Sequence, residues 1–566
     1  MLRWLARWAS PLATGPTGLD IDGITLKKAS DFNPDNPVER HEQDSFNRWP
    51  FAKKLADTIV RLPTDASAPV IGLFGTWGAG KTTVLNFVRE ALEVYHKDKV
   101  VVFSFNPWLF RDSETLLLAY FAGLAATISA SLARPNRKLG AVLAKYSVAL
   151  SWVPIAGNAV AKTLEQIGKD LAENPIDKQR ANMVELMKQS DKTVVVLIDD
   201  LDRLDRDEVM AMLKFVRLSA NFPNMLYLLA FDEKRVARVA GEAYGEDNDG
   251  HLFLEKVIQY PYSLPVAPKH RLTVFVMERA KAACVAAGIQ LSEQDWSDFE
   301  ELCRSTFLIR LATPRQGLRY ANALRFALPM LAGEVDPFNL MVVEAMRILF
   351  PDLYDWARNL DQSAGDPVSS TGLSAEAKKA LSEEAMKAVS KEERPAVSGI
   401  LTALMGRTER QIQAVFGNPR YHERYFSYAI PPDQLPDAPI EELLRLAETD
   451  AQDAINKATE DVIQTRPTDL FRRLDRRRMT FRQIEHLTLA LLAAELASRG
   501  GQSYKETDLA KSVVWSITNM IANSGRFRAS DDFNQLIKKL IETATPKEFK
   551  EKLKSDLAQV LSRHFR

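Results

Sequence analysis

The sequence lacks several features that would assign it to a specialised class of protein. It has only two cysteines in 566 residues, Cys284 and Cys303, too few for a disulfide framework or a zinc site. Basic and acidic residues both number 74, so the formal net charge is zero, which argues against binding of nucleic acid through overall charge. No internal repeat of fixed period is found. A soluble globular protein of a reducing compartment is expected, and the cytoplasm is the predicted location.

Long hydrophobic runs are also scarce. Residues 116–132 and 141–161 are the most apolar, but both are rich in Ala, Ser and Gly rather than Leu, and we interpret the first as a buried core helix. In residues 1–13, Arg3 and Arg7 interrupt the apolar run, so a signal peptide is not indicated. This segment is either a helix that docks on a membrane surface or a partner, or an irregular tail. A transmembrane protein is not expected, whereas a peripheral one is compatible with the sequence.

Strands and helices alternate in the first half of the chain. Apolar runs predict strands at 70–74, 100–105, 194–198 and 225–231, with a fifth at 257–260 or just after it. Helical periodicity lies between them, at 81–92, 113–132 and 208–220. This alternation predicts an α/β fold with a doubly wound, mostly parallel sheet. Beyond residue 268 the pattern is helical to the end.

The length predicts two or three domains. We expect an N-terminal lead-in at 1–45 and an α/β core at 46–268 with a helical insertion at 134–180. A helical lid-like domain at 269–360 and a linker at 361–375, rich in Gly, Ser, Pro and Asp, would follow. The α-helical C-terminal region, 376–566, carries no catalytic pattern and is predicted to bind partners.

The segment Gly75–Thr82, GTWGAGKT, fits the pattern G-x-x-x-x-G-K-[ST] in full and lies between a strand and a helix. Its glycines let the backbone turn so that successive N–H groups point at phosphate oxygens, and the following helix adds its positive end. Lys81 would reach the β- and γ-phosphates, and the Thr82 hydroxyl would coordinate Mg²⁺. The segment predicts an ATP site, with binding residues Gly75, Thr76, Trp77, Gly78, Ala79, Gly80, Lys81, Thr82 and Thr83.

A second acidic segment completes the expected site. In VVVLIDDLDR, five apolar residues lead into Asp199 and Asp200. Asp199 would hold Mg²⁺, and Asp200 would polarise the attacking water. The alternative is a solvated acidic turn, which is improbable beside a complete phosphate loop. Asp232 follows the next strand and has two interpretations, a sensor of the γ-phosphate or a helix N-cap.

The chain resembles the KAP family of P-loop NTPases, which is related to the AAA+ and STAND ATPases. The resemblance spans roughly residues 35–350 and rests on GLFGTWGAGKTTVLN, FSFNPWLF, VVVLIDDLDRL, NMLYLLAFDEKRV, FLEKVIQYPYSLP and TPRQGLRYANAL. It implies a P-loop NTPase sheet in the order 5-1-4-3-2, flanked by helices and followed by helical domains. It also implies that Arg315 reaches the nucleotide as a catalytic arginine. Many members carry a transmembrane hairpin, for which the insertion here offers too little apolar sequence.

Two functions are therefore predicted. The first is an ATPase that switches or powers a larger assembly with separate partner proteins, and the resemblance implies a role in bacterial phage defence. The second is a nucleotide-gated scaffold with little hydrolysis, and homo-oligomers are compatible with both. Nucleic acid is a weaker candidate partner: residues 466–483 hold seven arginines, but we favour a solvated helix with local ion pairs over a phosphate-binding patch.

Overall fold

The computed structural model describes residues 36–64, 68–110, 192–219, 223–244, 250–360, 375–405, 419–432, 434–465, 467–475, 479–498, 508–523, 531–545 and 547–564. Residues 116, 119–120, 123–124, 127–128, 368–369, 372–373 and 416 are also described. The chain divides into two compact units, residues 1–36 and 37–566, and all elements named below belong to the second. Residues 1–13, the insertion 134–180 and most of the linker 361–375 lie outside the described residues.

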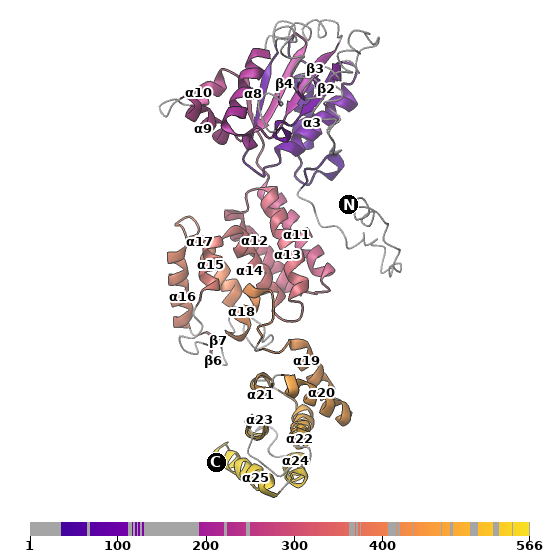
Figure 1. Cartoon of the computed structure of the whole chain (residues 1–566), viewed down its shortest axis with the longest axis vertical. Coiled ribbons are helices and arrows are strands. Elements are labelled where there is room, and N and C mark those ends of the chain that lie inside the picture. Colours follow the sequence, from indigo (N-terminus) through magenta and orange to yellow (C-terminus); the bar gives the residue numbers. More distant parts are fainter. Residues whose placement is uncertain are drawn as a thin grey trace, which may run out of the picture. The chain divides into compact units, whose positions relative to one another are not determined.

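The sheet contains the parallel strands β1 (Val70–Phe74), β2 (Val100–Phe105), β3 (Thr193–Ile198), β4 (Met225–Phe231) and β5 (Tyr260–Ser263). Their order is β2-β3-β4-β1-β5, the expected order 5-1-4-3-2 read from the other edge. Figure 1 labels β2, β3 and β4 of this sheet. The fifth strand takes the later of its two expected positions. β1 and β4 are buried along their whole length, because they lie inside the sheet and helices cover both faces.

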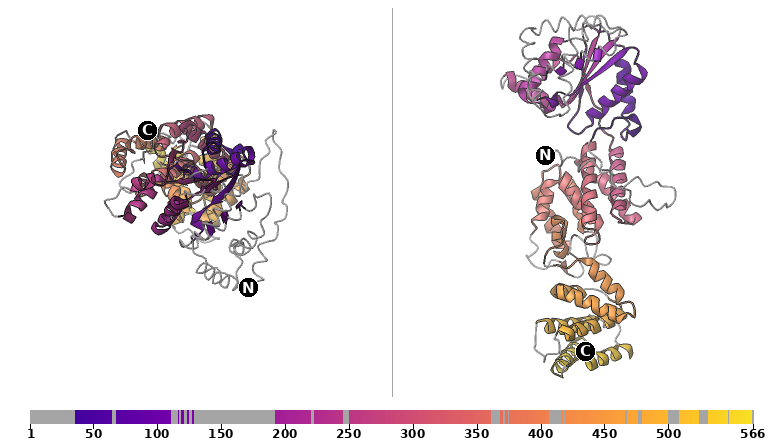
Figure 2. Two further views of the ribbon diagram at one scale, coloured as in Figure 1. Left: turned by 90° about the horizontal axis from the view of Figure 1, so that it is seen from above. Right: turned by 45° about the vertical axis from the view of Figure 1, so that its right-hand side comes forward.

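Successive residues of strands β1 to β4 supply two separate cores. Helices α2 (Trp49–Ile59) and α3 (Lys81–Tyr95) pack with Ile71 and Leu73 of β1. On the opposite face, α8 (Arg206–Ser219), α9 (Glu233–Tyr244) and α10 (Gly250–Glu255) pack with Val70 and Phe74 (Figures 1 and 2). The described residues between 116 and 128 are helical and join this second core, as expected for a core helix. Its fully buried side chains recur one turn apart: Leu116, Tyr120, Leu124 and Ile128.

Among the described residues after β5, all elements are helices apart from a short hairpin. One core is shared by α11 (Lys269–Ala286), α12 (Glu293–Ser305), α13 (Pro314–Met330), α14 (Pro337–Leu349), α15 (Pro351–Arg358), α16 (Ala375–Ala388), α17 (Arg394–Met405) and α18 (Pro419–Ser427). A further core is shared by α19 (Asp437–Leu446), α20 (Gln452–Thr465), α21 (Pro467–Asp475), α22 (Phe481–Ser498), α23 (Asp508–Asn523), α24 (Asp531–Thr543) and α25 (Lys547–His564). The strands β6 (Val368–Ser369) and β7 (Gly372–Leu373) pair within the expected linker. Helices α15 and α16 lie on either side of that linker and belong to the same core, so the core does not divide there. The predicted domain boundaries stay a prediction.

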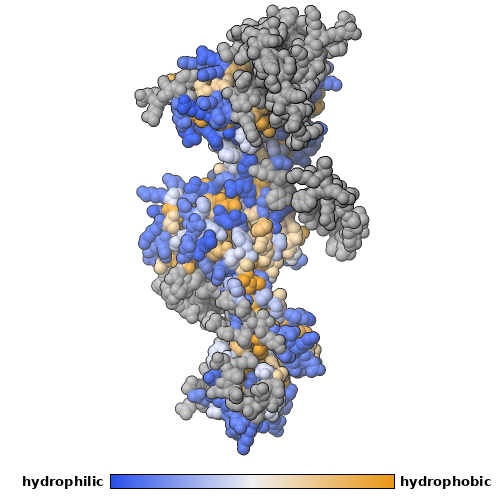
Figure 3. Space-filling view, in the orientation of Figure 1, coloured by the Kyte–Doolittle hydropathy of each residue, from blue (hydrophilic) through white to orange (hydrophobic). Residues whose placement is uncertain are grey.

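The described part of the chain contains no helix that is both long and apolar enough to cross a membrane. In the view of Figure 3, hydrophilic residues cover much of the described surface and apolar residues interrupt them in patches. Among the large exposed side chains, Trp77, Trp108 and Leu109 belong to the loops that follow β1 and β2. Apolar exposure therefore includes the edge of the sheet where β1 and β2 end.

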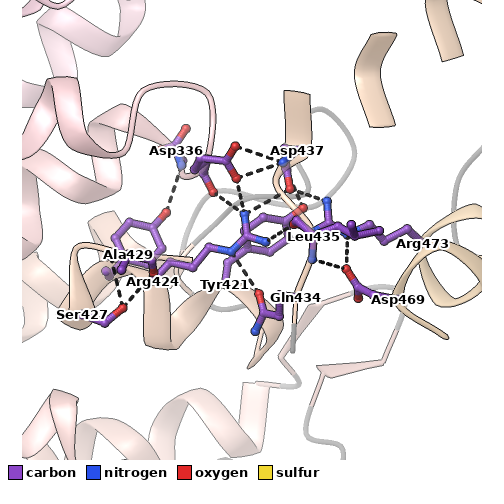
Figure 4. A network of polar contacts seen from close by, with 12 residues as sticks. Asp336, Tyr421, Arg424, Ser427, Ala429, Gln434, Leu435, Asp437, Asp469 and Arg473 are labelled. Atoms are coloured by element: carbon purple, nitrogen blue, oxygen red, sulfur yellow. Dashed lines mark hydrogen bonds and ion pairs between the residues drawn. The ribbon is translucent and has the colours of Figure 1, made fainter. Parts of the chain in front are cut away.

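Arg473, in the arginine-rich stretch 466–483, is buried rather than solvated. This α21 side chain is 2% exposed, its Nε donates to Asp469 Oδ2 at 3.0 Å, and its Nη1 donates to Asp437 (Figure 4). Arg424 on α18 is fully buried and shares Asp437 at 3.1 Å. The expected local ion pair is present, between Arg473 and Asp469. The expectation that the helix is solvated is wrong at Arg473, because buried carboxylates balance its charge in the interior. Arg482 is half-exposed and pairs with Asp450, and Arg466, Arg476, Arg477 and Arg478 lie outside the described residues.

Candidate nucleotide-binding site

The predicted site residues gather where the parallel strands end. The loop Gly75–Thr82 joins β1 to α3, and Asp199 and Asp200 follow β3, two strands away in the sheet. Carboxyl ends of parallel strands meet at one edge, which is where such folds bind ligands. Within the loop, Gly78 and Gly80 have φ of 79° and 93°. L-residues with side chains rarely adopt this conformation, so glycine is favoured at both positions of the loop.

Lys81 is the first residue of α3, and its side chain is buried in the loop. Its Nζ donates to the Gly75 carbonyl at 3.0 Å, and the Thr76 carbonyl lies at 3.5 Å. The same nitrogen lies 3.7 Å from Oδ2 of Asp202, which is also buried. The loop thus holds an ammonium that a phosphate group can attract, with one carboxylate partner nearby.

Asp199 and Thr82, the two predicted Mg²⁺ ligands, are neighbours. Burial, its largest cause, raises the pKa of Asp199 to about 6, and the charge of Asp200 adds to the rise. Thr82 and Lys81 act in the opposite direction. Oδ1 of Asp199 accepts a hydrogen bond from the N–H of Asp200 at 2.9 Å, whereas Oδ2 is buried without a partner of normal geometry.

The donor set around Asp199 fits a hard divalent cation. Oδ1 of Asp202 is a second buried carboxylate oxygen that lacks a hydrogen-bond partner in the described structure. Such oxygens are costly to bury unless an ion or a donor completes them. Carboxylate and hydroxyl oxygens are the ligands that Mg²⁺ prefers. The residues present therefore fit the cation that a nucleotide of this kind carries.

Asp200 differs from its neighbour in that both of its carboxylate oxygens are engaged. Its backbone has φ 59°, a left-handed conformation that turns the chain sharply after β3. Oδ2 accepts from the side-chain amide of Asn106 at 3.0 Å, and Oδ1 pairs with Nε of Arg203 at 2.8 Å. The guanidinium of Arg203 lies over the exposed ring of Trp108, 4.9 Å from its centroid. The predicted general base is thus ionically paired within its own chain.

Asn106 is a site residue that the sequence analysis missed. It follows β2 directly, and its Oδ1 also caps the short helix η3 (Pro107–Leu109) by accepting from Trp108 N–H. A signal was present, because a polar residue after an apolar strand is the rule that singled out Asp199 and Asp232. Arg48, also missed, directly precedes α2 and donates to the Ala79 carbonyl of the loop. No local motif marks it.

The tip of the loop meets the start of α13. Trp77 is 56% exposed, and the guanidinium carbons of Arg235 and Arg315 lie 5.8 and 5.9 Å from its ring centroid. The Arg315 N–H faces the Gly78 carbonyl at 3.5 Å, and a Cβ on Gly78 would lie 2.8 Å from Arg315 Cβ. Only glycine permits this approach. The structure brings Arg315 to the loop, and its catalytic role stays a proposal.

Other predicted residues take structural positions. Asp232 Oδ1 accepts from the Arg235 N–H at 3.3 Å, so it caps α9 as one of its two interpretations expected. Its role as a phosphate sensor stays a prediction. The N–H of Ala79 donates to the Thr76 carbonyl at 3.1 Å, which closes a turn inside the loop. The Thr83 hydroxyl accepts from the N–H of Val38 at 3.2 Å, so its side chain fixes the preceding segment on α3.

Comparisons with known proteins agree with this geometry. The model of the KAP family P-loop domain matches residues 48–331. The phage T7 exclusion protein of Escherichia coli (strain K12) is 24% identical over 378 residues, 61% of this chain and 50% of that protein. The chain therefore spans about half the length of this relative.

The solved structures that match the chain are more distant in sequence. The ORC2 protein of Aeropyrum pernix, in ADPNP–ADP complexes, is 15% identical with a TM-score of 0.28 and covers 59% of this chain and 74% of its own. The ORC1 protein of the same organism, in complex with DNA, is 14% identical with a TM-score of 0.27, and the coverage is 66% and 86%.

Proposed function

The chain belongs to the KAP family of P-loop NTPases, and from this premise we propose that it binds ATP with Mg²⁺ and hydrolyses it. The observation that carries the proposal is the junction of the loop Gly75–Thr82 with Asp199. A buried lysine, a hydroxyl and an unpartnered carboxylate oxygen meet there at the end of two parallel strands. These groups complement the negative charge and the cation of a nucleoside triphosphate.

The roles of the residues follow from their positions. The N–H groups of the loop and the start of α3 would hold the phosphates, and Lys81 would exchange its bond to the Gly75 carbonyl for one to the phosphate. Thr82 and Asp199 would hold Mg²⁺, which neutralises charge on the phosphate oxygens when bound. Asp200 would take a proton from the attacking water, on a carboxylate that Asn106 and Arg203 hold in place.

A titration of ATP into the purified chain tests binding directly. Wild-type protein is expected to bind ATP more tightly with Mg²⁺ than without it, and Lys81→Ala to lose at least about tenfold in affinity because the flexible cation at the phosphates is removed. Arg61→Ala is a suitable control, since Arg61 is an exposed cation just beyond α2. Equal ATP affinity in Lys81→Ala and wild type would contradict the assignment of the site.

We further propose that nucleotide turnover switches or powers a larger assembly in bacterial antiviral defence. This proposal is supported by the likeness to the phage T7 exclusion protein, which covers 61% of this chain. Helices α19–α25 would offer the surface for partner proteins, and a cytoplasmic location would supply ATP. The test is plaque formation on bacteria that carry the gene with its neighbours. Loss of protection with Lys81→Ala is expected, and full protection by that variant would contradict a nucleotide-dependent role.

One observation favours a second function, a nucleotide-gated scaffold with little hydrolysis. Both oxygens of Asp200 are held by Asn106 and Arg203, so the proposed base is restrained. A scaffold would bind ATP and change its partners without rapid turnover. Steady-state phosphate release separates the two functions, because the scaffold predicts binding without release.

A further inference from the structure

Arg48 lies against the phosphate-binding loop, and hydrogen bonds to Asp44 hold the backbone around it. The N–H groups of Arg48 and Trp49 both donate to Oδ2 of Asp44, at 2.5 and 2.8 Å, and Phe46 donates to Oδ1 at 3.0 Å. This carboxylate therefore ties down the start of α2. The Arg48 side chain is only 4% exposed, although it carries a charge that normally stays in water. A guanidinium buried in this way requires hydrogen-bond partners that offset the cost of removing its charge from water.

Those partners are backbone carbonyls of the loop and of the segment after β5. Nη1 donates to the Ala79 carbonyl, and a Cβ built on Gly80 would lie 2.3 Å from this nitrogen. The guanidinium thus occupies the space that a side chain at Gly80 would need. Glycine is required there twice, once by the φ of 93° and once by Arg48.

The bond to Ala79 has a consequence on the other side of the same peptide. In a trans peptide the C=O and the following N–H point in opposite directions. Arg48 holds the Ala79 carbonyl on its own side, so the N–H of Gly80 is directed to the opposite side. Successive N–H groups of such a loop are what hold phosphate oxygens. The orientation of this one peptide therefore bears on anion binding.

The same guanidinium reaches the chain segment that leaves the sheet for α11. Nη2 lies 3.5 Å from the carbonyl oxygen of Pro265, the weaker of the two contacts. One residue earlier, Leu264 donates its N–H to the Phe74 carbonyl at 2.6 Å, and its side chain lies 3.3 Å from a Cβ built on Gly75. This segment thus packs on the first residue of the loop, while Arg48 bonds the loop near its end.

We infer that Arg48 is a positioning residue of the nucleotide site, which orients the Ala79–Gly80 peptide for phosphate binding and ties the loop to Pro265. The inference rests on the proposed nucleotide-binding function. Arg48 acts through the loop backbone and holds no substrate atom itself. A planar guanidinium can donate to two carbonyls from separate nitrogens, whereas the single ammonium of lysine cannot reproduce that fork.

The experiment uses the full chain with Arg48→Met, Arg48→Lys and the exposed control Arg61→Met. Hydrogen exchange of peptides that contain residues 75–82 is measured without nucleotide, and Mg²⁺–ATP affinity and turnover are measured in parallel. Arg48→Met is expected to raise exchange in the loop and to weaken affinity about tenfold or more, as for loss of a charged hydrogen bond. Turnover at saturating ATP should change less than about threefold, because loop contacts act on ground and transition states alike. Arg48→Lys should be intermediate, and Arg61→Met should match wild type.

Wild-type exchange and wild-type affinity in folded Arg48→Met would overturn the inference. A lower melting temperature with unchanged affinity per folded molecule would also overturn it, since it shows a structural role only. If Arg48→Met does not fold, Arg48→Lys decides, and its wild-type affinity and exchange would be the contradicting result. If Lys81→Ala loses ATP binding while the Arg48 variants keep wild-type affinity and exchange, the inference on Arg48 is refuted and the proposed nucleotide-binding function stands. If the wild type binds no nucleotide, the proposed function fails, and the exchange measurement still decides whether Arg48 orders the loop.

Discussion

The side-chain amide of Asn106, at the end of β2, lies 3.0 Å from Oδ2 of Asp200, which follows β3. Since Arg203 pairs with the other oxygen at 2.8 Å, the two contacts hold the carboxylate in one orientation. A proton from the attacking water must then reach a remaining lone pair of a carboxylate whose orientation these contacts restrain. The polar residue after β2 is thereby linked to the proposed chemistry of the residue after β3.

Asn106→Ala is expected to raise basal ATP turnover, by up to about tenfold, because one restraining hydrogen bond to the base is lost. ATP affinity should stay at the wild-type value, since Asn106 contacts the carboxylate and not the loop. Steady-state phosphate release measures the change. In an Asp200→Asn background the same substitution should give no gain. A fall in turnover would show that Asn106 positions Asp200 for catalysis rather than restraining it.

The neighbouring aspartates should respond differently to the same substitution. Asp199→Asn should weaken the Mg²⁺-dependent part of ATP affinity, because Asp199 offers the buried oxygen without a hydrogen-bond partner. Asp200→Asn should leave Mg²⁺–ATP bound and lower turnover by about 10²-fold, as expected for loss of a general base. ATP titrations at varied Mg²⁺, combined with phosphate release, separate the two effects. Identical behaviour of both variants would refute this division of roles.

Arg315 is proposed to act within its own chain, since its guanidinium lies 5.9 Å from the ring of Trp77 in the same loop. Arg203 and Arg235 are the competing candidates for a catalytic arginine, and either could serve a neighbouring subunit. An equimolar mixture of Arg315→Ala and Lys81→Ala chains should therefore remain inactive, because neither variant can complete a site. Each variant alone provides the baseline. Recovery of turnover in the mixture would show that the arginine crosses between subunits.

His422 on α18 should make the helical part sensitive to acid. It is buried, its Nε2 donates to the Ala357 carbonyl at 3.0 Å, and burial lowers its pKa to about 4. Between the unfolded pKa of about 6.5 and the folded value, the unfolded chain binds the proton first. Stability is therefore lost as the pH falls through this window, by at most about 3 kcal/mol.

Melting temperatures of wild type and His422→Gln at pH 7 and pH 4.5 test this. At pH 7 the variant should melt lower, because it loses the packing of the neutral imidazole. The gap should narrow at pH 4.5, where the wild type alone carries the cost of charging or excluding that proton. A gap in melting temperature that stays constant would mean that His422 binds its proton equally well in the folded and unfolded chains, so that burial does not lower its pKa.

The sheet could be predicted because its signals are local. Strands β1 to β4 are apolar runs that are followed by a polar or glycine residue, and β1, β2 and β4 fall on the residues expected from the sequence. The loop pattern likewise locates Lys81 and Thr82 without reference to the rest of the chain. The strand order needed more than local sequence, and the resemblance to a family supplied it.

Contacts between distant residues could not be predicted in this way. Arg48 lies 31 residues from its partner Ala79, and Asn106 lies 94 residues from Asp200. Arg473 is a charged residue in a basic stretch, yet it is buried and donates a hydrogen bond to Asp437, 36 residues earlier. The charge and periodicity of a segment predict which of its side chains are exposed to solvent. These pairings depend instead on which elements the fold brings together.

Steady-state phosphate release by the purified full chain, with ATP and Mg²⁺, is the most direct test of the central claim that the loop Gly75–Thr82 and Asp199–Asp200 form an ATPase site. The account predicts release by the wild type that requires Mg²⁺ and is abolished in Lys81→Ala, while the exposed control Arg61→Ala keeps the wild-type rate. Release that is equal in wild type and Lys81→Ala, or a wild type that binds ATP without releasing phosphate, would contradict it.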